Sequence, residues 1–227
     1  MPGDRQRILL MRHPETTANL AGTLSGRSDV DLSPEGERQM ARAVEALVAW
    51  GPDRVWSSPL SRCLAIAREA AWRLGVPLEV RQELAEIEFG PAQGLTVGEL
   101  RAMGYDFPWA LGPDGRSRAP EGAECFEELF ARAHGLLEAL RPLGGRTACV
   151  THGGLTRAVL ASALQIPLTS FWRLRLPNVS SQVLACDGTS YTLVAIGLAP
   201  EEVRRRAEDS SLLGRDTTEN IAEGSVK

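Results

Sequence analysis

The chain of 227 residues contains almost no lysine: its Lys and Arg residues total 25, and Lys227, the last residue, is the only lysine among them. This excludes chemistry that needs a lysine inside the fold, such as a Schiff base, a pyridoxal phosphate linkage or the phosphate-binding lysine of a P-loop. A phosphate group bound by this chain would be held by arginine, histidine and backbone N–H groups.

Cysteine is also scarce. The chain has four cysteines and no CxxC pair, which fits neither a zinc site nor a secreted disulfide framework. No apolar run approaches the roughly 18 residues that a membrane span requires. The first apolar run, residues 8–11, is only four residues long before Arg12, which is too short for a signal peptide. We therefore expect a cytoplasmic protein with no metal site and no membrane partner.

The overall charge is weakly negative. Lys and Arg total 25 against 29 Asp and Glu, a net charge of −4, so we expect no nucleic-acid partner. A hydrophobic fraction of 43% is typical of one globular domain. We expect a catalytic domain over residues 1–199 and a polar tail over residues 200–227, flexible or loosely helical, that can be removed with little effect on folding. The composition leaves a monomer and a homodimer open.

Apolar periodicity predicts alternating strands and helices. Strands are expected at residues 7–12, 54–57, 78–81, 147–151, 183–186 and 191–196. Helices are expected from Ser33-Pro34 to Gly51, from Ser58-Pro59 to Gly75, after the capping box Thr96-x-x-Glu99, at residues 126–140 and at residues 153–164. Residues 104–122 lack periodicity and predict a long loop.

This alternation predicts a three-layer α/β sandwich, in which helices cover both faces of a mostly parallel central sheet. The sequence Asp187-Gly188 between the last two strands predicts a hairpin, which adds an antiparallel strand. Ligands of such folds bind beyond the carboxyl ends of the strands.

Two of the three histidines occupy equivalent places in this pattern. His13 follows the strand at 7–12 and His152 follows the strand at 147–151, although 139 positions separate them. We expect them to lie close together because the carboxyl ends of parallel strands meet at one edge of a sheet. Either histidine alone would be read as an ordinary hydrogen-bonding residue, but the matched pair, with Arg12 before His13, indicates a reactive site.

Arg62 lies in the first turn of a predicted helix, where the helix dipole disfavours a positive charge. A bound anion at that end would remove the conflict. The alternative is a surface arginine that extends into water, and this segment alone does not decide between the two.

Taken together, the motifs resemble the histidine phosphatase superfamily, in its phosphoglycerate-mutase-like branch, over residues 7–197. In chain order the motifs are Arg12-His13, Glu15-Thr16-x-x-Asn19, Gly26-Arg27-x-Asp29-x-x-Leu32-Ser33-x-x-Gly36, Ser57-Ser58-Pro59-Leu60-x-Arg62, Leu84-x-Glu86-x-x-Phe89-Gly90 and Thr151-His152-Gly153-Gly154. One position departs from the family pattern: Pro14 stands where glycine is usual. Proline lacks a backbone N–H donor and suits the first position of a helix.

The resemblance implies roles for five residues. His13 would attack phosphorus and form a phosphohistidine, with its other ring nitrogen held by an acceptor such as a backbone carbonyl. Arg12 and Arg62 would clamp the phosphoryl oxygens, and His152 would donate to the same oxygens. Glu86 would protonate the leaving alkoxide. Their combined positive charge means that no metal and no cofactor are expected.

Two further assignments follow from the resemblance. Glu88 competes with Glu86 as the acid, but Glu86 fits the family spacing Leu-x-Glu-x-x-x-Gly. The phosphate and substrate side would be lined by Asn19, Thr16, Ser25, Gly26 and Gly153.

The expected activity is hydrolysis of a small phosphomonoester, of the sugar phosphate, phosphoglycerate or α-ribazole phosphate class. A phosphoglycerate mutase is the alternative within the family. Mutases carry a longer insertion before the second histidine, whereas 65 residues separate Glu86 from His152 here, with Arg116 and Arg118 as extra cations. A non-catalytic phosphate-binding protein is disfavoured because all five catalytic positions are filled. A metal hydrolase lacks a third histidine ligand.

Three other residues are expected to be structural. His134, beside an apolar helical stripe, is expected at the surface. Trp109 and Trp172 are expected mainly in the core, with a contribution to a substrate pocket as the alternative for Trp109.

Overall fold

The computed structural model describes residues 6–208, which form a six-stranded sheet with strand order β3-β2-β4-β1-β5-β6. The strands are β1 (Gln6–Arg12), β2 (Arg54–Ser57), β3 (Leu78–Val80), β4 (Arg146–Thr151), β5 (Ser181–Cys186) and β6 (Tyr191–Leu198). The pairs β3–β2, β2–β4 and β4–β1 are parallel, whereas β5 is antiparallel to both β1 and β6. Five strands therefore point one way and β5 the other, which confirms the predicted sheet.

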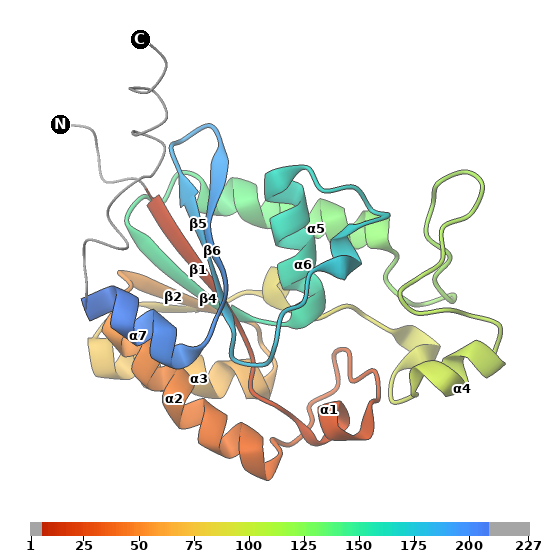
Figure 1. The fold of residues 1–227 in the computed structure, drawn as a ribbon, viewed down its shortest axis with the longest axis horizontal. Coiled ribbons are helices and arrows are strands. Elements are labelled where there is room, and N and C mark those ends of the chain that lie inside the picture. The colour runs from red at the N-terminus through yellow and green to blue at the C-terminus, as the bar shows by residue number, and fades with distance from the viewer. Residues whose placement is uncertain (1–5, 209–227) are drawn as a thin grey trace, which may run out of the picture.

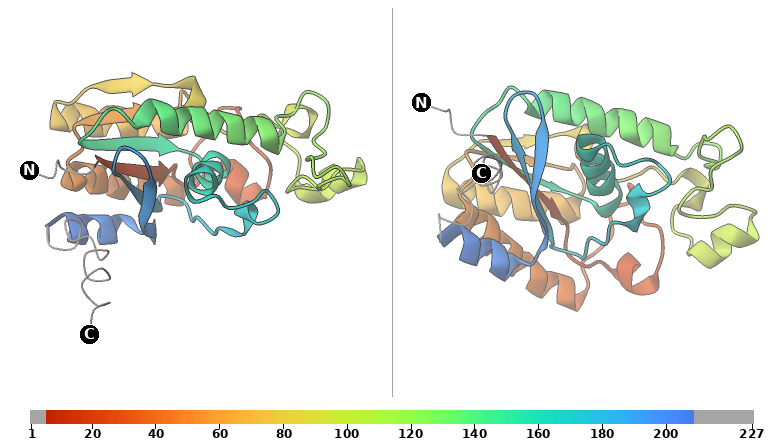
Figure 2. Two further views of the ribbon diagram at one scale, coloured as in Figure 1. Left: turned by 90° about the horizontal axis from the view of Figure 1, so that it is seen from above. Right: turned by 45° about the horizontal axis from the view of Figure 1, so that its top comes forward.

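Helices cover both faces of this sheet (Figures 1 and 2). The helices are α1 (Thr17–Ala21), α2 (Pro34–Trp50), α3 (Ser61–Leu74), α4 (Val97–Ala102), α5 (Phe126–Leu140), α6 (Gly153–Leu164) and α7 (Pro200–Glu208). One core lies between the sheet and α5 with α6, and the other lies between the sheet and α2, α3 and α7. Alternate residues of β1 face the two cores. Ile8 and Leu10 face the core on the side of α5 and α6, and Leu9 and Met11 face the core on the side of α2 and α3. The three-layer prediction is confirmed.

Local sequence signals place most helix ends where they were expected. Ser33 caps α2 by accepting a hydrogen bond from the Gly36 N–H, and Gly51 ends the helix in the left-handed conformation. The capping box of Thr96 and Glu99 opens α4. Helix α3 differs, because Leu60 is its N-cap and the helix begins at Ser61, after the predicted start.

Helix α1 was not predicted, and it corrects the expectation for Pro14. The helix begins at Thr17, with Thr16 as its N-cap in a capping box with Asn19. Pro14 therefore lies in the turn between β1 and α1 and is not the first residue of a helix.

The expected tail after residue 199 is helical in its first part, but this part is packed on the domain and not loose. Residues 200–208 form α7, which packs against α2, and the Val203 side chain is buried with 2% exposure. The sequence shows no apolar stripe here because one valine makes most of the buried contact. The remainder of the predicted tail lies outside the described residues.

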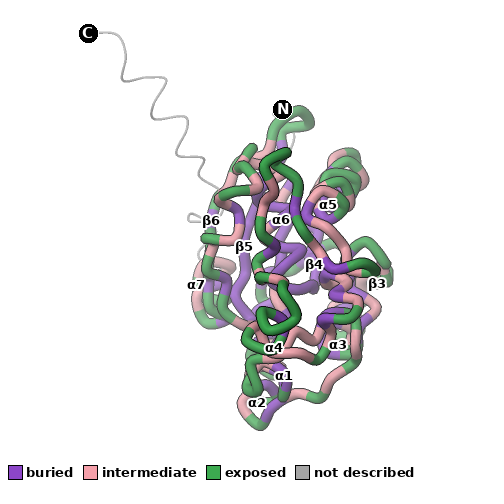
Figure 3. Tube along the Cα trace, turned by 90° about the vertical axis from the view of Figure 1, so that its right-hand side faces the viewer, coloured by how far each residue is buried: buried purple, intermediate pink, exposed green. Residues whose placement is uncertain are grey.

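The segment between α4 and α5 is a long loop, as predicted, and it extends to one side of the sheet in Figure 1. Its Trp109 is buried in a cluster of aromatic rings that includes Phe89, Phe107 and Phe126. Trp109 is thus a core residue. In Figure 3 the buried positions concentrate in the strands and on the inner helix faces.

None of the helices within residues 6–208 is both long enough and apolar enough to cross a membrane.

Candidate active site

The site lies at the carboxyl ends of β1 and β4. These strands pair in parallel, with Arg12 opposite Thr151, so the residue after each strand reaches the same edge of the sheet. Those residues are His13 and His152, and their ring centroids are 5.2 Å apart. The expected closeness of the two histidines is confirmed. Both are buried, with 3% and 0% exposure.

The backbone of the next residue fixes the tautomer of His13. The Nδ1 atom lies 2.6 Å from the carbonyl oxygen of Pro14, which can only accept a hydrogen bond. Nδ1 therefore carries the proton, and the lone pair of the neutral ring is on Nε2. Burial, followed by the positive charges of Arg12 and Arg62, holds the pKa of His13 well below its usual value. His13 is therefore a neutral imidazole at neutral pH.

His152 is held from the side of α3. Its Nε2 lies 2.7 Å from the Ser58 hydroxyl and 3.5 Å from the Cys63 sulfur. Burial, the neighbouring His13 and the two arginines lower the pKa of His152 well below the usual value. Burial also raises the pKa of the Cys63 thiol, so this sulfur remains protonated.

Two buried arginines flank the histidines. Arg12 donates from Nη1 to the Leu176 carbonyl at 2.7 Å, and Arg62 donates from Nη1 and Nη2 to the Ser28 and Gly26 carbonyls, each at 2.7 Å. Burial, partly opposed by Glu86, lowers the pKa of Arg12. Arg62 is only 2% exposed, so the alternative of a surface arginine is wrong.

The two guanidinium groups have donors that the protein does not satisfy. Among the described residues, neither the Nε of Arg12 nor the Nε of Arg62 has a hydrogen-bond acceptor, although both atoms are buried. Leaving a buried donor unpaired costs about 1–3 kcal/mol. An anion with several oxygens, such as a phosphoryl group, would both accept these hydrogen bonds and separate the two like charges.

Glu86 lies at the N-terminus of α6. Its Oε2 accepts a hydrogen bond from the Gly154 N–H at 3.1 Å, and its Oε1 accepts from Leu155 at 3.3 Å and from Ile87 at 3.0 Å. A Cβ on Gly154 would overlap with Oε1, so this close approach requires glycine. The first turn of α6 therefore places the carboxyl group near Arg12, whose Nε lies next to Gly153.

Glu88, the competing acid, occupies a different environment. Its Oε1 accepts a hydrogen bond from the Gly90 N–H at 3.2 Å, and Oε2 lies 3.7 Å from Arg27 Nε. Within the described part of the chain, no hydrogen bond or ion pair joins the Glu88 side chain to α6 or to either histidine. The geometry favours Glu86 over Glu88 as the acid.

The predicted substrate-side residues lie around this centre with different local roles. The Asn19 side-chain oxygen accepts from the Thr16 N–H and from Asn178, which leaves its amide nitrogen as the end suited to a phosphate oxygen. Thr16 is fully buried, and its hydroxyl caps α1. Gly26 has a φ of +50° and presents its carbonyl to Arg62, next to the half-buried Ser25. Gly153 begins α6 against Arg12.

Sequence reasoning missed Asn178 and Arg157. The Asn178 Nδ2 donates to the His13 carbonyl at 3.1 Å and to Asn19, so it links the end of β1 to α1. The Arg157 guanidinium donates to the carbonyls of Gly153 and Leu174 and lies over the Trp172 ring. No short motif indicates either residue, because each has a partner that is distant in sequence: the His13 carbonyl for Asn178 and the Leu174 carbonyl for Arg157.

Residues 6–208 contain no group of three or more His, Cys, Asp or Glu side chains placed to hold a metal ion. The third histidine, His134, is exposed on α5, as expected. Arg116 and Arg118 are also exposed, and Arg118 pairs with Asp114 at 2.8 Å within their own loop.

Comparison with known proteins agrees with this geometry. The family model of the histidine phosphatase superfamily (branch 1) matches residues 8–199. The chain is 30% identical over 178 residues to a glucosyl-3-phosphoglycerate phosphatase of Mycobacterium tuberculosis, covering 73% of this chain and 78% of that protein. It is 31% identical over 179 residues to a probable phosphoglycerate mutase of Cronobacter sakazakii, covering 77% and 82%.

A solved structure described as mycobacterial hydrolase 1 superposes with a TM-score of 0.76 at 26% sequence identity. The match covers 86% of this chain and 99% of that one. The shared architecture thus extends over most of this chain.

Proposed function

This chain belongs to branch 1 of the histidine phosphatase superfamily and is a phosphatase of that family, and we propose that its residues His13, Arg12, Arg62, His152 and Glu86 hydrolyse a small phosphomonoester through a phosphohistidine. The observation that carries the proposal is the hydrogen bond from His13 Nδ1 to the Pro14 carbonyl. It leaves Nε2 unprotonated beside two buried guanidinium groups.

In the first step, the lone pair of His13 Nε2 forms a bond to phosphorus while the ester P–O bond breaks. The electrons of that bond leave on the alkoxide oxygen, which takes a proton from the Glu86 carboxylic acid. The products are the free alcohol, a phosphohistidine and the Glu86 carboxylate.

The positive groups stabilise the transferring phosphoryl group. The unsatisfied Nε–H groups of Arg12 and Arg62 donate to its non-bridging oxygens, and the His152 ring donates as charge shifts during transfer. These donors are fixed before the substrate binds, since the arginines are anchored on loop carbonyls and His152 on Ser58. Little reorganisation is then needed in the transition state.

In the second step, water attacks the phosphohistidine. The Glu86 carboxylate accepts a proton from this water, the N–P bond breaks, and its electrons return to His13 Nε2. Inorganic phosphate leaves, and both groups regain their starting protonation. Three backbone N–H groups hold the Glu86 carboxylate in place between the two steps.

The proposed substrate is a small phosphorylated metabolite, of the sugar phosphate, phosphoglycerate or α-ribazole phosphate class. Asn19, Thr16, Ser25, Gly26 and Gly153 are proposed to line the phosphate side. For the mutase alternative, Arg116 and Arg118 would need to reach this centre, but both are exposed in the loop between α4 and α5. The exposed position of these two arginines does not support that alternative, although one similar relative is a probable phosphoglycerate mutase.

The test is a panel of phosphorylated metabolites ranked by kcat/KM, measured with and without a chelator. We expect hydrolysis without added metal and inhibition by vanadate, which adopts the five-coordinate shape of the transferring phosphorus. Loss of activity on chelation that a divalent ion restores would contradict the metal-independent mechanism. Transfer of phosphate to phosphoglycerate faster than to water would favour the mutase.

A further inference from the structure

The acid-bearing segment, residues 84–90, is not part of a strand or of a long helix. It runs between two short 3-10 turns, Gln82–Leu84 and Gly90–Ala92, so ladder hydrogen bonds do not fix its backbone. The position of the Glu86 carboxyl group must therefore depend on contacts with other parts of the chain.

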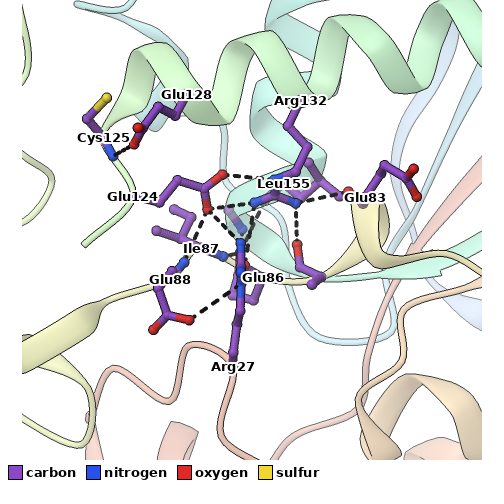
Figure 4. Close-up of polar contacts among 12 residues, drawn as sticks. Arg27, Glu83, Glu86, Ile87, Glu88, Glu124, Cys125, Glu128, Arg132 and Leu155 are labelled. Atoms are coloured by element: carbon purple, nitrogen blue, oxygen red, sulfur yellow. Dashed lines mark hydrogen bonds and ion pairs between the residues drawn. The ribbon is translucent and has the colours of Figure 1, made fainter. Parts of the chain in front are cut away.

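Arg132 of α5 provides several of those contacts (Figure 4). Its Nη1 donates to the Glu83 carbonyl at 2.9 Å and to the Ala85 carbonyl at 2.6 Å, and its Nη2 reaches the Glu86 carbonyl at 3.4 Å. One side chain thus holds three carbonyl groups at the start of the acid-bearing segment and just before it. The side chain is only 14% exposed.

Glu124 completes the arrangement from the segment before α5. Its carboxylate accepts from Arg132 Nε at 2.8 Å and Nη2 at 2.7 Å, in the bidentate geometry of a strong ion pair. The same carboxylate accepts from the Glu88 N–H at 3.1 Å, while the backbone N–H of Glu124 donates to the Glu88 carbonyl at 2.7 Å. Glu124 therefore clamps the far side of the same segment.

These hydrogen bonds account for the full donor capacity of Arg132. A guanidinium group has five N–H donors, and the five acceptors are three carbonyl oxygens and the two oxygens of Glu124. None is left for a substrate oxygen. Arg27 also donates to the Glu86 carbonyl, at 3.2 Å, from a side chain that is 41% exposed.

We propose that the Arg132–Glu124 pair consists of positioning residues that hold the peptide of Glu86 so that its carboxyl group stays at the N-terminus of α6, where it can reach the leaving oxygen. This inference rests on the proposed role of Glu86 as the acid. The pair acts through geometry. The planar guanidinium group of Arg132 fixes the backbone carbonyl groups around Glu86, and the N–H groups of α6 hold the Glu86 carboxylate.

A displaced acid has a distinctive kinetic signature. An alkyl alkoxide can scarcely leave without a proton, whereas p-nitrophenolate can. Loss of acid positioning should therefore lower kcat/KM for an alkyl phosphate more than for p-nitrophenyl phosphate. General destabilisation of the fold would lower both equally, so the ratio of the two constants separates positioning from a merely structural role.

We would measure this ratio in Arg132→Met, Arg132→Lys and Glu124→Gln. A small displacement of a catalytic group can cost up to about a hundredfold in rate, and we expect the alkyl-to-aryl ratio to fall about tenfold in Arg132→Met. Lysine keeps the charge near His152 but cannot make the several directed hydrogen bonds of a guanidinium group. The alkyl-to-aryl ratio of Arg132→Lys should therefore be close to that of Arg132→Met. A wild-type ratio in Arg132→Lys would show that charge alone matters and would overturn the proposal.

Arg54→Met is the matched control, because Arg54 is also a half-buried arginine that donates to a backbone carbonyl, that of Gly144, and it lies at the start of β2, away from the site. Its ratio should equal that of the wild type. If thermal unfolding shows that Arg132→Met does not fold, the alkyl-to-aryl ratio of Glu124→Gln provides the test instead. The single amide oxygen of glutamine cannot serve three donors, and an unchanged ratio there would overturn the proposal.

Glu86→Gln separates this inference from the proposed function. If Glu86→Gln leaves the ratio unchanged, the assignment of the acid is wrong and the positioning role falls with it. If Glu86→Gln lowers the ratio but the folded Arg132 and Glu124 variants do not, only the positioning role is wrong. In the double variant with Arg132→Met, the ratio should fall no further than in Glu86→Gln alone, since the two changes remove one function.

Discussion

The two halves of the site are built by different means. On the phosphate side, His13 and His152 directly follow paired parallel strands, and their positions are set by the sheet. On the acid side, Glu86 lies in a segment without ladder hydrogen bonds and depends on side chains that come from α5 and from the residues before it. The first half is rigid because of backbone topology, and the second because of an ion pair between side chains.

This difference has an energetic consequence. Substitutions on the phosphate side remove donors or the nucleophile but leave the sheet in place. On the acid side, removing either Arg132 or Glu124 leaves the other buried charge without its partner, which is costly in a setting of low polarity. The acid can thus be displaced by substitutions that touch neither substrate nor Glu86 itself.

The largest effect should come from the nucleophile. His13→Ala should reduce turnover by roughly four orders of magnitude or more, because no neighbouring group replaces Nε2. It should also abolish the acid-labile, base-stable phosphoenzyme in a rapid-quench experiment with labelled substrate. His134→Ala, on the exposed surface of α5, serves as the control and should behave as the wild type. If a phosphoenzyme forms normally in His13→Ala, the assignment of His13 as the nucleophile is wrong.

The second histidine should matter less. His152→Ala removes a preorganised donor to the transferring phosphoryl group, and we expect kcat to fall about a hundredfold. Because this half of the site does not protonate the leaving group, alkyl and aryl substrates should suffer equally in single-turnover measurements. A selective loss on the alkyl substrate would mean that His152 takes part in proton delivery.

The acid half should show the opposite selectivity. Glu86→Gln keeps the size of the side chain but cannot supply a proton, so hydrolysis of an alkyl phosphate should slow by about ten- to a hundredfold more than that of p-nitrophenyl phosphate. The comparison requires conditions in which formation of the phosphoenzyme limits the rate. Glu88→Gln is the matched control and should stay within a few-fold of wild type on both substrates. The reverse outcome would identify Glu88 as the acid.

Removal of α7 should affect neither half selectively. Truncation after Leu198 loses the burial of Val203 against α2, and burying one such side chain contributes about 1.5–3 kcal/mol. We expect Tm to fall by several degrees while the alkyl-to-aryl ratio stays constant. Val203→Asp in the full chain should reproduce the loss, and Glu201→Gln, at an exposed position, should not. An unchanged Tm would show that the helix contributes nothing to the domain.

The smallest effect is expected in the pH dependence of stability. The folded-state pKa values of His13 and His152 are depressed, so above pH 6.5 both histidines are neutral in the folded and unfolded states. As pH falls below 6.5, the unfolded chain binds protons that the folded chain does not, and stability is lost. In urea unfolding between pH 6.5 and 5.5, His13→Asn should make this slope shallower, by at most about 1.4 kcal/mol per pH unit. An identical slope in the variant and the wild type would mean that the folded protein does not hold His13 in its neutral form.

Sequence alone predicted the strand ends, most helix caps and the closeness of His13 and His152, since capping residues and a shared sheet edge leave local signals. The adjacency of His13 and His152 followed from two short apolar runs. The acid side left no such signal: Arg132 and Glu124 look like ordinary charges in and beside an amphipathic helix. Helix α7 was misjudged for a related reason, because one buried valine in a polar segment has no periodicity. Contacts between single side chains and distant backbone atoms are what sequence patterns do not contain.

The position of Cys63 gives the site an internal reporter of motion. Its sulfur lies against His152 with no exposed surface, and burial keeps the thiol protonated, so a thiol reagent can reach it only when the interior transiently opens. The labelling rate of Cys63 therefore measures the equilibrium between closed and open forms around the second histidine. A bound oxyanion that bridges the two arginines would slow this labelling, while half-exposed Cys125 would react at an unchanged rate.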